Sequence, residues 1–181
     1  MRSLAAITAA ILAGLVCTPA AGQTATGNTY TVQSNSTRLL GNVRVSYVDF
    51  PTAAGPRPAI QIDADRVVLD NLHVRFPGQP GGFADVWQRT GDGRTTTLNG
   101  NFRIVIARLT TTPEIAGLAS PEPVTVDAAW APDDVAEHLK EISLDTPDEV
   151  SEQLVMRDGS METYYISADD IRFDEGTSIG L

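Results

Sequence analysis

Apolar residues recur at every second position through much of the segment from Tyr30 to Leu109, and this pattern limits the fold more than any other feature. Near the end of the segment, for example, Phe102, Ile104 and Ile106 lie two residues apart. Such alternation is typical of a β-strand with one buried face. Proline- and glycine-rich segments separate the runs, so the sequence predicts short strands that turn back on one another.

The expected strands follow one another closely along the chain. Residues 39–50 form one, and residues 60–76 form two, with a turn or bulge near Asp70-Asn71 where the alternation changes phase. Residues 83–89 and 95–109 flank Thr90-Gly91-Asp92-Gly93, which predicts a hairpin between them. Two further strands are expected at residues 123–130 and 161–173.

The period changes to that of a helix between these last two strands. Pro132 opens a helix to Ile142, with acidic residues in its first turn. Thr146 to Glu149 resembles a capping box that opens a second short helix, with Val150 and Leu154 facing inward. The sequence therefore predicts an antiparallel sandwich or jellyroll with two short helices inserted at about 131–155. The alternative is a single-sheet α+β fold with both helices on one face.

The first 22 residues have the layout of a secretory signal peptide. Arg2 precedes an apolar run from Leu4 to Val16 that is shorter than the roughly 20 residues of a spanning helix. Small residues follow and predict cleavage near Gly22. Cys17 raises the alternative of a lipoprotein, but Val16 stands where a small residue is needed. We expect residues 23–37 to be a flexible polar segment and residues 38–181 to form one domain, secreted or held in the periplasm or cell envelope.

Acidic residues are concentrated in the last third of the chain. Residues 23–112 hold nine Arg and six Asp, whereas residues 113–181 hold three basic residues against seventeen acidic ones. The formal net charge is −10. Because an acidic surface repels nucleic acid and anionic headgroups, neither is an expected partner. The carboxylates are interpreted as a hydrated surface, with calcium binding left open.

Two short segments recur in the same order. Gly41-Asn42-Val43-Arg44-Val45 matches Gly100-Asn101-Phe102-Arg103-Ile104, and the segment that starts Ile62-Asp63-Ala64-Asp65 matches one that starts Ile166-Ser167-Ala168-Asp169. The two halves of the unit are 21 residues apart in the first copy and 66 in the second, counted from glycine to isoleucine. This repetition indicates a structural duplication whose second copy carries the helices as an insertion.

At these residues the chain resembles periplasmic lipopolysaccharide-transport proteins of the organic-solvent-tolerance type. The resemblance covers about 30 residues and implies stacked antiparallel strands in a β-jellyroll that carries acyl chains, without cofactor or catalytic residue. The sequence departs from that family in the spacing of its second unit, its acidic helical insertion and its few repeats. No ligand-binding residue carries over.

The motifs of common enzymes are missing from the sequence. It has no Gly-x-Ser-x-Gly, no His-Glu-x-x-His and no phosphate-binding glycine loop. Its two histidines, His73 and His138, are expected to face solvent. Trp87 and Trp130 are interpreted as core residues, with a carbohydrate or lipid groove as the alternative. We therefore assign no catalytic, cofactor-binding or metal-binding residue.

Four acidic pairs leave one enzymatic hypothesis open. The pairs are Asp133-Asp134, Asp148-Glu149, Asp169-Asp170 and Asp174-Glu175. A hydrolase of extracellular polymers would need two carboxylates across a cleft. The favoured prediction is a non-enzymatic envelope or extracellular protein that binds a partner or ligand through its β framework, with an envelope component or an amphiphile as the candidate.

Overall fold

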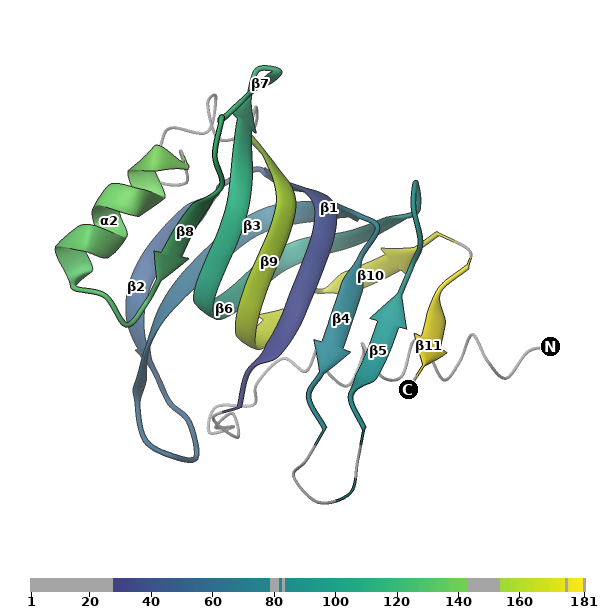
Figure 1. Ribbon diagram of the computed structural model, residues 1–181, viewed down its shortest axis with the longest axis horizontal. Coiled ribbons are helices and arrows are strands. Elements are labelled where there is room, and N and C mark those ends of the chain that lie inside the picture. The colour runs from purple at the N-terminus through teal and green to yellow at the C-terminus, as the bar shows by residue number, and fades with distance from the viewer. Residues whose placement is uncertain (1–27, 79–81, 83, 143–153, 175, 181) are drawn as a thin grey trace.

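The computed structural model describes residues 28–78, 82, 84–142, 154–174 and 176–180, and these residues form one antiparallel sheet and one helix (Figure 1). The helix is α2 (Pro132–Glu141). The strands are β1 (Tyr30–Leu40), β2 (Arg44–Phe50), β3 (Arg57–Asp70), β4 (His73–Phe76), β5 (Val86–Arg89), β6 (Thr95–Ile115), β7 (Leu118–Ala119), β8 (Val124–Asp127), β9 (Leu154–Ser167), β10 (Asp170–Phe173) and β11 (Ser178–Gly180). The predicted mainly-β, antiparallel fold is confirmed.

The sheet curls around a single apolar interior. Its strand order is β11-β5-β4-β1-β9-β6-β3-β2, and the end of β1 also pairs with β3, so that β1, β9, β6 and β3 form a closed ring of pairings. In Figure 1, β3 passes behind β6, β9 and β1. The alternating residues of all these strands meet in one cluster. Its most deeply buried members include Ile60, Ile62, Ile106, Leu109 and Val32.

β3, β4, β5 and β6 together make one long bent hairpin. β4 pairs with β5 from Phe76↔Val86 to His73↔Arg89, and β3 pairs with β6 from Asp70↔Thr95 onward. The predicted turn at residues 90–93 therefore does not join two paired strands, and the hairpin prediction there was wrong. Those residues bulge out of one arm, opposite Asn71 in the other. The strands that pair at this end of the hairpin are instead β4 and β5.

Residues 30–37 do not belong to a flexible segment, as residues 23–37 were expected to. They form most of β1, which lies between β4 and β9 in the middle of the sheet. Tyr30 and Val32 point into the core. Ser34 and Thr37 are buried as well, and their hydroxyls lie 2.6 Å apart. This mutual hydrogen bond allows a polar sequence to occupy an interior strand.

The first predicted helix is confirmed as α2. Pro132 lies at its start, Asp133 and Asp134 lie in its first turn, and Val135 and Leu139 are buried. The second predicted helix begins within residues 143–153, which are outside the described residues. Leu154, expected on its inner face, is instead the first residue of β9 and is buried.

The duplicated sequence unit forms the same local structure twice. Gly41 and Asn42 have φ values of 74° and 48°, and Gly100 and Asn101 have 72° and 46°. Asn42 Nδ2 donates to Asp65 Oδ2 at 2.7 Å, and Asn101 Nδ2 donates to Asp169 Oδ2 at 2.8 Å. The backbone N–H of each aspartate donates to the carbonyl of the matching glycine, at 2.8 Å and 2.9 Å.

The two units lie side by side along one bend of the sheet. The register between β3 and β6 shifts between Ala64↔Phe102 and Arg66↔Asn99, which places Gly100 and Asn101 opposite the single residue Asp65. This is a β-bulge, a device that bends a strand sharply. The bend therefore runs from Gly41-Asn42 through Asp65 and Gly100-Asn101 to Asp169. Beyond it, β6 exchanges its β10 neighbour for β9.

Candidate functional site

The outer face of the sheet carries two rows of side chains that cross six adjacent strands: β5, β4, β1, β9, β6 and β8. We call this surface the outer face, and it consists of these two rows. The first row runs Arg89, His73, Gln33, Ser160, Thr110, Thr125. The second row runs Trp87, Arg75, Thr31, Glu162, Arg108, Asp127. None of these residues is among the buried ones.

The rows follow from the alternation that builds the core. The buried neighbours Val32, Val74 and Leu109 point inward from the same strands, so the residues on either side of them must point outward. Antiparallel pairing then places the outward residues of neighbouring strands opposite one another. Five strand spacings of about 4.8 Å make each row about 24 Å long.

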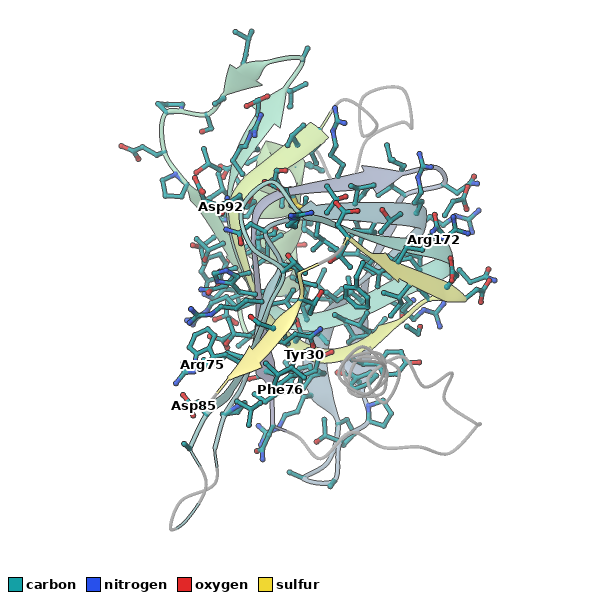
Figure 2. All side chains as sticks on the ribbon, turned by 90° about the vertical axis from the view of Figure 1, so that its right-hand side faces the viewer. Tyr30, Arg75, Phe76, Asp85, Asp92 and Arg172 are labelled. Carbon is teal, nitrogen blue, oxygen red and sulfur yellow. The ribbon has the colours of Figure 1, made fainter. Side chains whose placement is uncertain are left out.

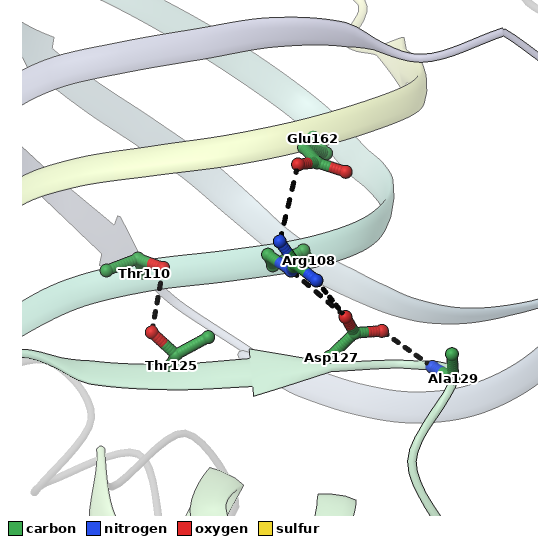
Figure 3. Close-up of polar contacts among 6 residues, drawn as sticks. All are labelled: Arg108, Thr110, Thr125, Asp127, Ala129 and Glu162. Carbon is green, nitrogen blue, oxygen red and sulfur yellow. Dashed lines mark hydrogen bonds and ion pairs between the residues drawn. The ribbon is translucent and has the colours of Figure 1, made fainter.

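An ion-pair ladder occupies one end of the outer face (Figure 3). Arg108 donates to Asp127 Oδ2 from Nε at 3.0 Å and from Nη2 at 2.6 Å, and its Nη1 lies 3.9 Å from Glu162. The hydrogen bond from Arg108 to Asp127 raises the pKa of Arg108. Burial alone would raise the pKa of Asp127, but the Ala129 N–H and Arg108 outweigh it and lower that pKa. Arg108 and Asp127 therefore neutralise each other within the protein.

A tryptophan between two arginines occupies the other end. The Arg75 and Arg89 guanidinium carbons lie 5.6 Å and 5.0 Å from the centre of the Trp87 ring, within the range of a cation–π interaction. Arg75 also donates from Nε to Asp85 Oδ2 at 2.7 Å. The Gly78 N–H and Arg75 lower the pKa of Asp85. Arg75 and Asp85 project from the side of the molecule opposite Arg172 of β10 (Figure 2).

A polar depression of about 200 Å³ lies beside this tryptophan cluster. Two of its lining residues are linked, because Asn71 Oδ1 lies 3.1 Å from His73 Nε2, and Asn71 Nδ2 also donates to Asp92 Oδ1 at 2.6 Å. Burial and the nearby Arg89 lower the pKa of His73, while Asp92 opposes them. The residues that line the depression are Gln33, Ser34, Asn35, Asn71, His73, Asp158, Gly159 and Ser160.

The structure divides the two tryptophans and two histidines singled out in the sequence between two places, with Trp87 and His73 on the outer face and Trp130 beside His138. Trp87 is half-buried on the outer face, so its interpretation as a core residue was wrong. Trp130 packs against the core, and its ring lies 4.9 Å from that of His138 on α2. His73 lies on β4 and takes part in the polar network. The two histidines are therefore not brought together.

Of the acidic pairs, Asp133 and Asp134 lie in the first turn of α2, and Asp169, Asp170 and Asp174 contact structural partners. Asp169 accepts from Asn101, and Asp170 accepts from Arg172 at 2.8 Å. Asp174 accepts from the N–H and hydroxyl of Thr95, which lower its pKa. Asp148-Glu149 and Glu175 lie outside the described residues. Within the described part of the chain, no three His, Cys, Asp or Glu side chains gather closely enough to hold a metal ion.

The interior offers little free space. Its cavity is about 30 Å³. That is room for about two water-sized molecules. Within the described residues, the Gln88 amide and the hydroxyls of Tyr30 and Thr96 have no hydrogen-bond partner although they are buried. Burial, followed by the charge of Tyr165, raises the pKa of Tyr30. Thr96 lines the cavity, whose other lining is almost entirely apolar.

No family model matches the chain, and no curated protein or solved structure gives a match. Among the described residues no helix has both the length and the hydrophobicity to cross a bilayer. The candidate site therefore rests on the geometry of the outer face alone.

Sequence reasoning missed most of this face. It singled out Trp87 and His73, but not Arg75, Arg89 or the polar rows. One signal could have revealed them. Trp87 and Arg89 are two residues apart on one predicted strand, as are His73 and Arg75 on another, so the two side chains of each pair point to the same face. Which residues of neighbouring strands lie opposite one another depends on the register, which a single sequence does not give.

Proposed function

We propose that the protein is an exported, non-enzymatic binding protein of the cell envelope or extracellular space, and that its outer face binds an extended, polar ligand, a polysaccharide. One observation carries this proposal: outward side chains form two unbroken rows over six strands. Export rests on the signal-peptide pattern of residues 1–22.

The chemistry of the rows suits a chain of sugars. Gln33, Ser160 and Thr110 lie consecutively in the first row and offer amide and hydroxyl groups that both donate and accept hydrogen bonds. Trp87 supplies an aromatic surface at one end. Because these groups are held on strands, they lose little conformational freedom when a ligand binds, and this preorganisation favours affinity.

An amphiphile carrier is the second form of the same proposal. The Gly-Asn and Ala-Asp units support a jellyroll-like arrangement of the curled sheet, and the apolar interior has the right polarity for an acyl chain. The cavity of about 30 Å³ is much smaller than an acyl chain, so loading would require the sheet to open. The geometry therefore favours the outer face over the interior.

The hydrolase alternative has less support. Asp169, Asp170 and Asp174 are occupied by Asn101, Arg172 and Thr95, as described above. A glycosidase would need two carboxylates that face each other across a substrate cleft. These contacts instead give the acids roles in bends and strand ends.

The test compares two aromatic variants of the secreted protein. Binding of immobilised polysaccharides, acidic and neutral, is measured for the wild type, for Trp87→Ala and for Tyr47→Ala. Tyr47 is 42% exposed on β2, which lies outside the six strands of the outer face. We expect Trp87→Ala to weaken binding by two- to tenfold, since contact with an aromatic contributes about 0.5–1.5 kcal/mol. Equal loss in both variants, or no binding by the wild type, would contradict the proposal.

A further inference from the structure

Arg89 is the arginine of the outer face whose charge is not paired with a carboxylate of the described residues. Its neighbour Arg75 is paired with Asp85, and Arg108 is paired with Asp127. Arg89 is exposed and has no carboxylate partner among the described residues. In a protein with a net charge of −10, an arginine left without an acidic partner is available to an anion from outside.

Trp87 restrains this arginine without using its hydrogen-bond donors. The guanidinium carbon of Arg89 lies 5.0 Å from the centre of the indole ring. A guanidinium held over an aromatic face keeps its N–H groups at the edge, where they match the two oxygens of a carboxylate. A second guanidinium, that of Arg75, lies 5.6 Å from the same ring, but its charge is balanced by Asp85.

The space in front of this arginine is open. A depression of about 210 Å³ is lined by Trp87, Arg89, Ser178, Ile179 and Gly180. In the register of β11 with β5, Ser178 lies opposite Arg89 and Gly180 lies opposite Trp87. A Cβ at Gly180 would meet nothing within 4 Å, so the space beside Gly180 is open among the described residues. Ser178 lines the same depression as Arg89 and offers a hydroxyl there.

The other charged side chains of the outer face determine which kind of anion can bind. Glu162 and Asp127 stand in the same row as Trp87, so the face is not uniformly basic. A flat anionic membrane would bring phosphates against these carboxylates. A sugar chain instead carries an acidic group on particular rings and presents only hydroxyls to the remaining rows.

We propose that Arg89, Trp87 and Ser178 bind the carboxylate-bearing sugar of an acidic polysaccharide, with the carboxylate on the guanidinium and the ring in the depression that these residues line. This inference rests on the proposed function, because it names the ligand class of the outer face. His73 lies opposite Arg89 on β4, so its imidazole is the neighbouring titratable group of the proposed carboxylate site.

The experiment uses calorimetry with a galacturonic acid oligomer and its methyl ester, which has the same rings without the charge. We expect the acid to bind at least tenfold more tightly than the ester, and Arg89→Gln to remove that difference, since hydrogen bonds to charged groups contribute about 1.5–3 kcal/mol. The matched control is Arg66→Gln. Arg66 is an exposed arginine of β3 that also lacks a carboxylate partner among the described residues.

The His73 imidazole provides a readout that general destabilisation would not change. Arg89 contributes to the lowered pKa of His73, whereas Asp92 acts in the opposite direction and Asp158 lines the same depression. A carboxylate bound at Arg89 offsets the positive charge, so ligand should raise the pKa of His73 in an NMR titration. His138 on α2 serves as the internal control.

The remaining outcomes separate this inference from the proposed function. Equal binding of acid and ester would overturn the carboxylate site and leave the polysaccharide function standing. Binding of neither would overturn both. If inorganic phosphate bound as tightly as the oligomer, the site would be a general anion site and the sugar-site proposal would be overturned. Arg89-dependent capture by phosphatidylglycerol vesicles would assign the site to a membrane instead.

Discussion

Substitution of Gly100 by alanine tests whether the bend of the sheet depends on contact between glycine and aspartate. Gly100 has a φ of 72°, and an added Cβ would lie 2.5 Å from Asp169 Oδ2 and 3.0 Å from Asp169 Cβ. Gly93 has a φ of 67° but nothing within 4 Å of an added Cβ. Gly93→Ala therefore measures the backbone effect alone, and Gly100→Ala measures the same effect together with the collision.

The expected magnitudes differ enough to be resolved. A left-handed conformation costs an L-residue about 1–2 kcal/mol, which is the loss expected for Gly93→Ala. Forcing an extra carbon into a filled space adds about 1–3 kcal/mol, so Gly100→Ala should lower the free energy of unfolding by about 2–5 kcal/mol. Asp169 can move away only by giving up its hydrogen bond from Asn101, a loss of about 1 kcal/mol.

Urea unfolding followed by circular dichroism gives the free energy of unfolding of each variant. The double variant Gly100→Ala/Asp169→Gly removes the colliding side chain, so the double-mutant cycle should show a favourable coupling. Gly41→Ala should match Gly100→Ala, because its Cβ would lie at the same 2.5 Å from Asp65 Oδ2. Equal losses at Gly93 and Gly100 would refute the reasoning.

Three further predictions concern stability. The lowered pKa of Asp174 gives stability that is present above the unfolded pKa of about 3.9 and lost as pH falls through the folded pKa, so Asp174→Asn should flatten the acid limb of a stability–pH curve. Ile106 is 0% exposed, so Ile106→Ala should lower the free energy of unfolding by about 2–5 kcal/mol in the same urea assay. Sodium and calcium, matched for ionic strength, should raise the melting temperature alike, because counter-ions screen the acidic surface; a saturating, calcium-specific rise would instead identify a metal site.

Local sequence chemistry predicted the parts of the fold that depend on neighbouring residues. The alternation at Phe102, Ile104 and Ile106 gave the correct buried face of β6. Pro132 and the two aspartates that follow it gave the correct start of α2. Each of these signals is contained within a few residues, and it holds whatever the rest of the chain does.

The incorrect predictions involve partners that lie far apart in the chain. Thr90 to Gly93 has the composition of a hairpin turn, but β4 and β3 already pair with the strands on either side of it, so these residues bulge. The polar start of β1 is buried because Ser34 and Thr37 satisfy each other. The outer face could not be predicted, since Trp87 and Asp127 share a row only through the pairing of six strands.

The repeated unit also bears on the order in which the chain folds. Asn42 and Asp65 are 23 residues apart, whereas Asn101 and Asp169 are 68 apart. Loop closure should therefore be about 1 kcal/mol less favourable for the second contact. The first unit can form early and present Asp65 and β3 as a template for the strand that carries Gly100 and Asn101. Folding kinetics should then show a larger φ-value for Asn42→Ala than for Asn101→Ala.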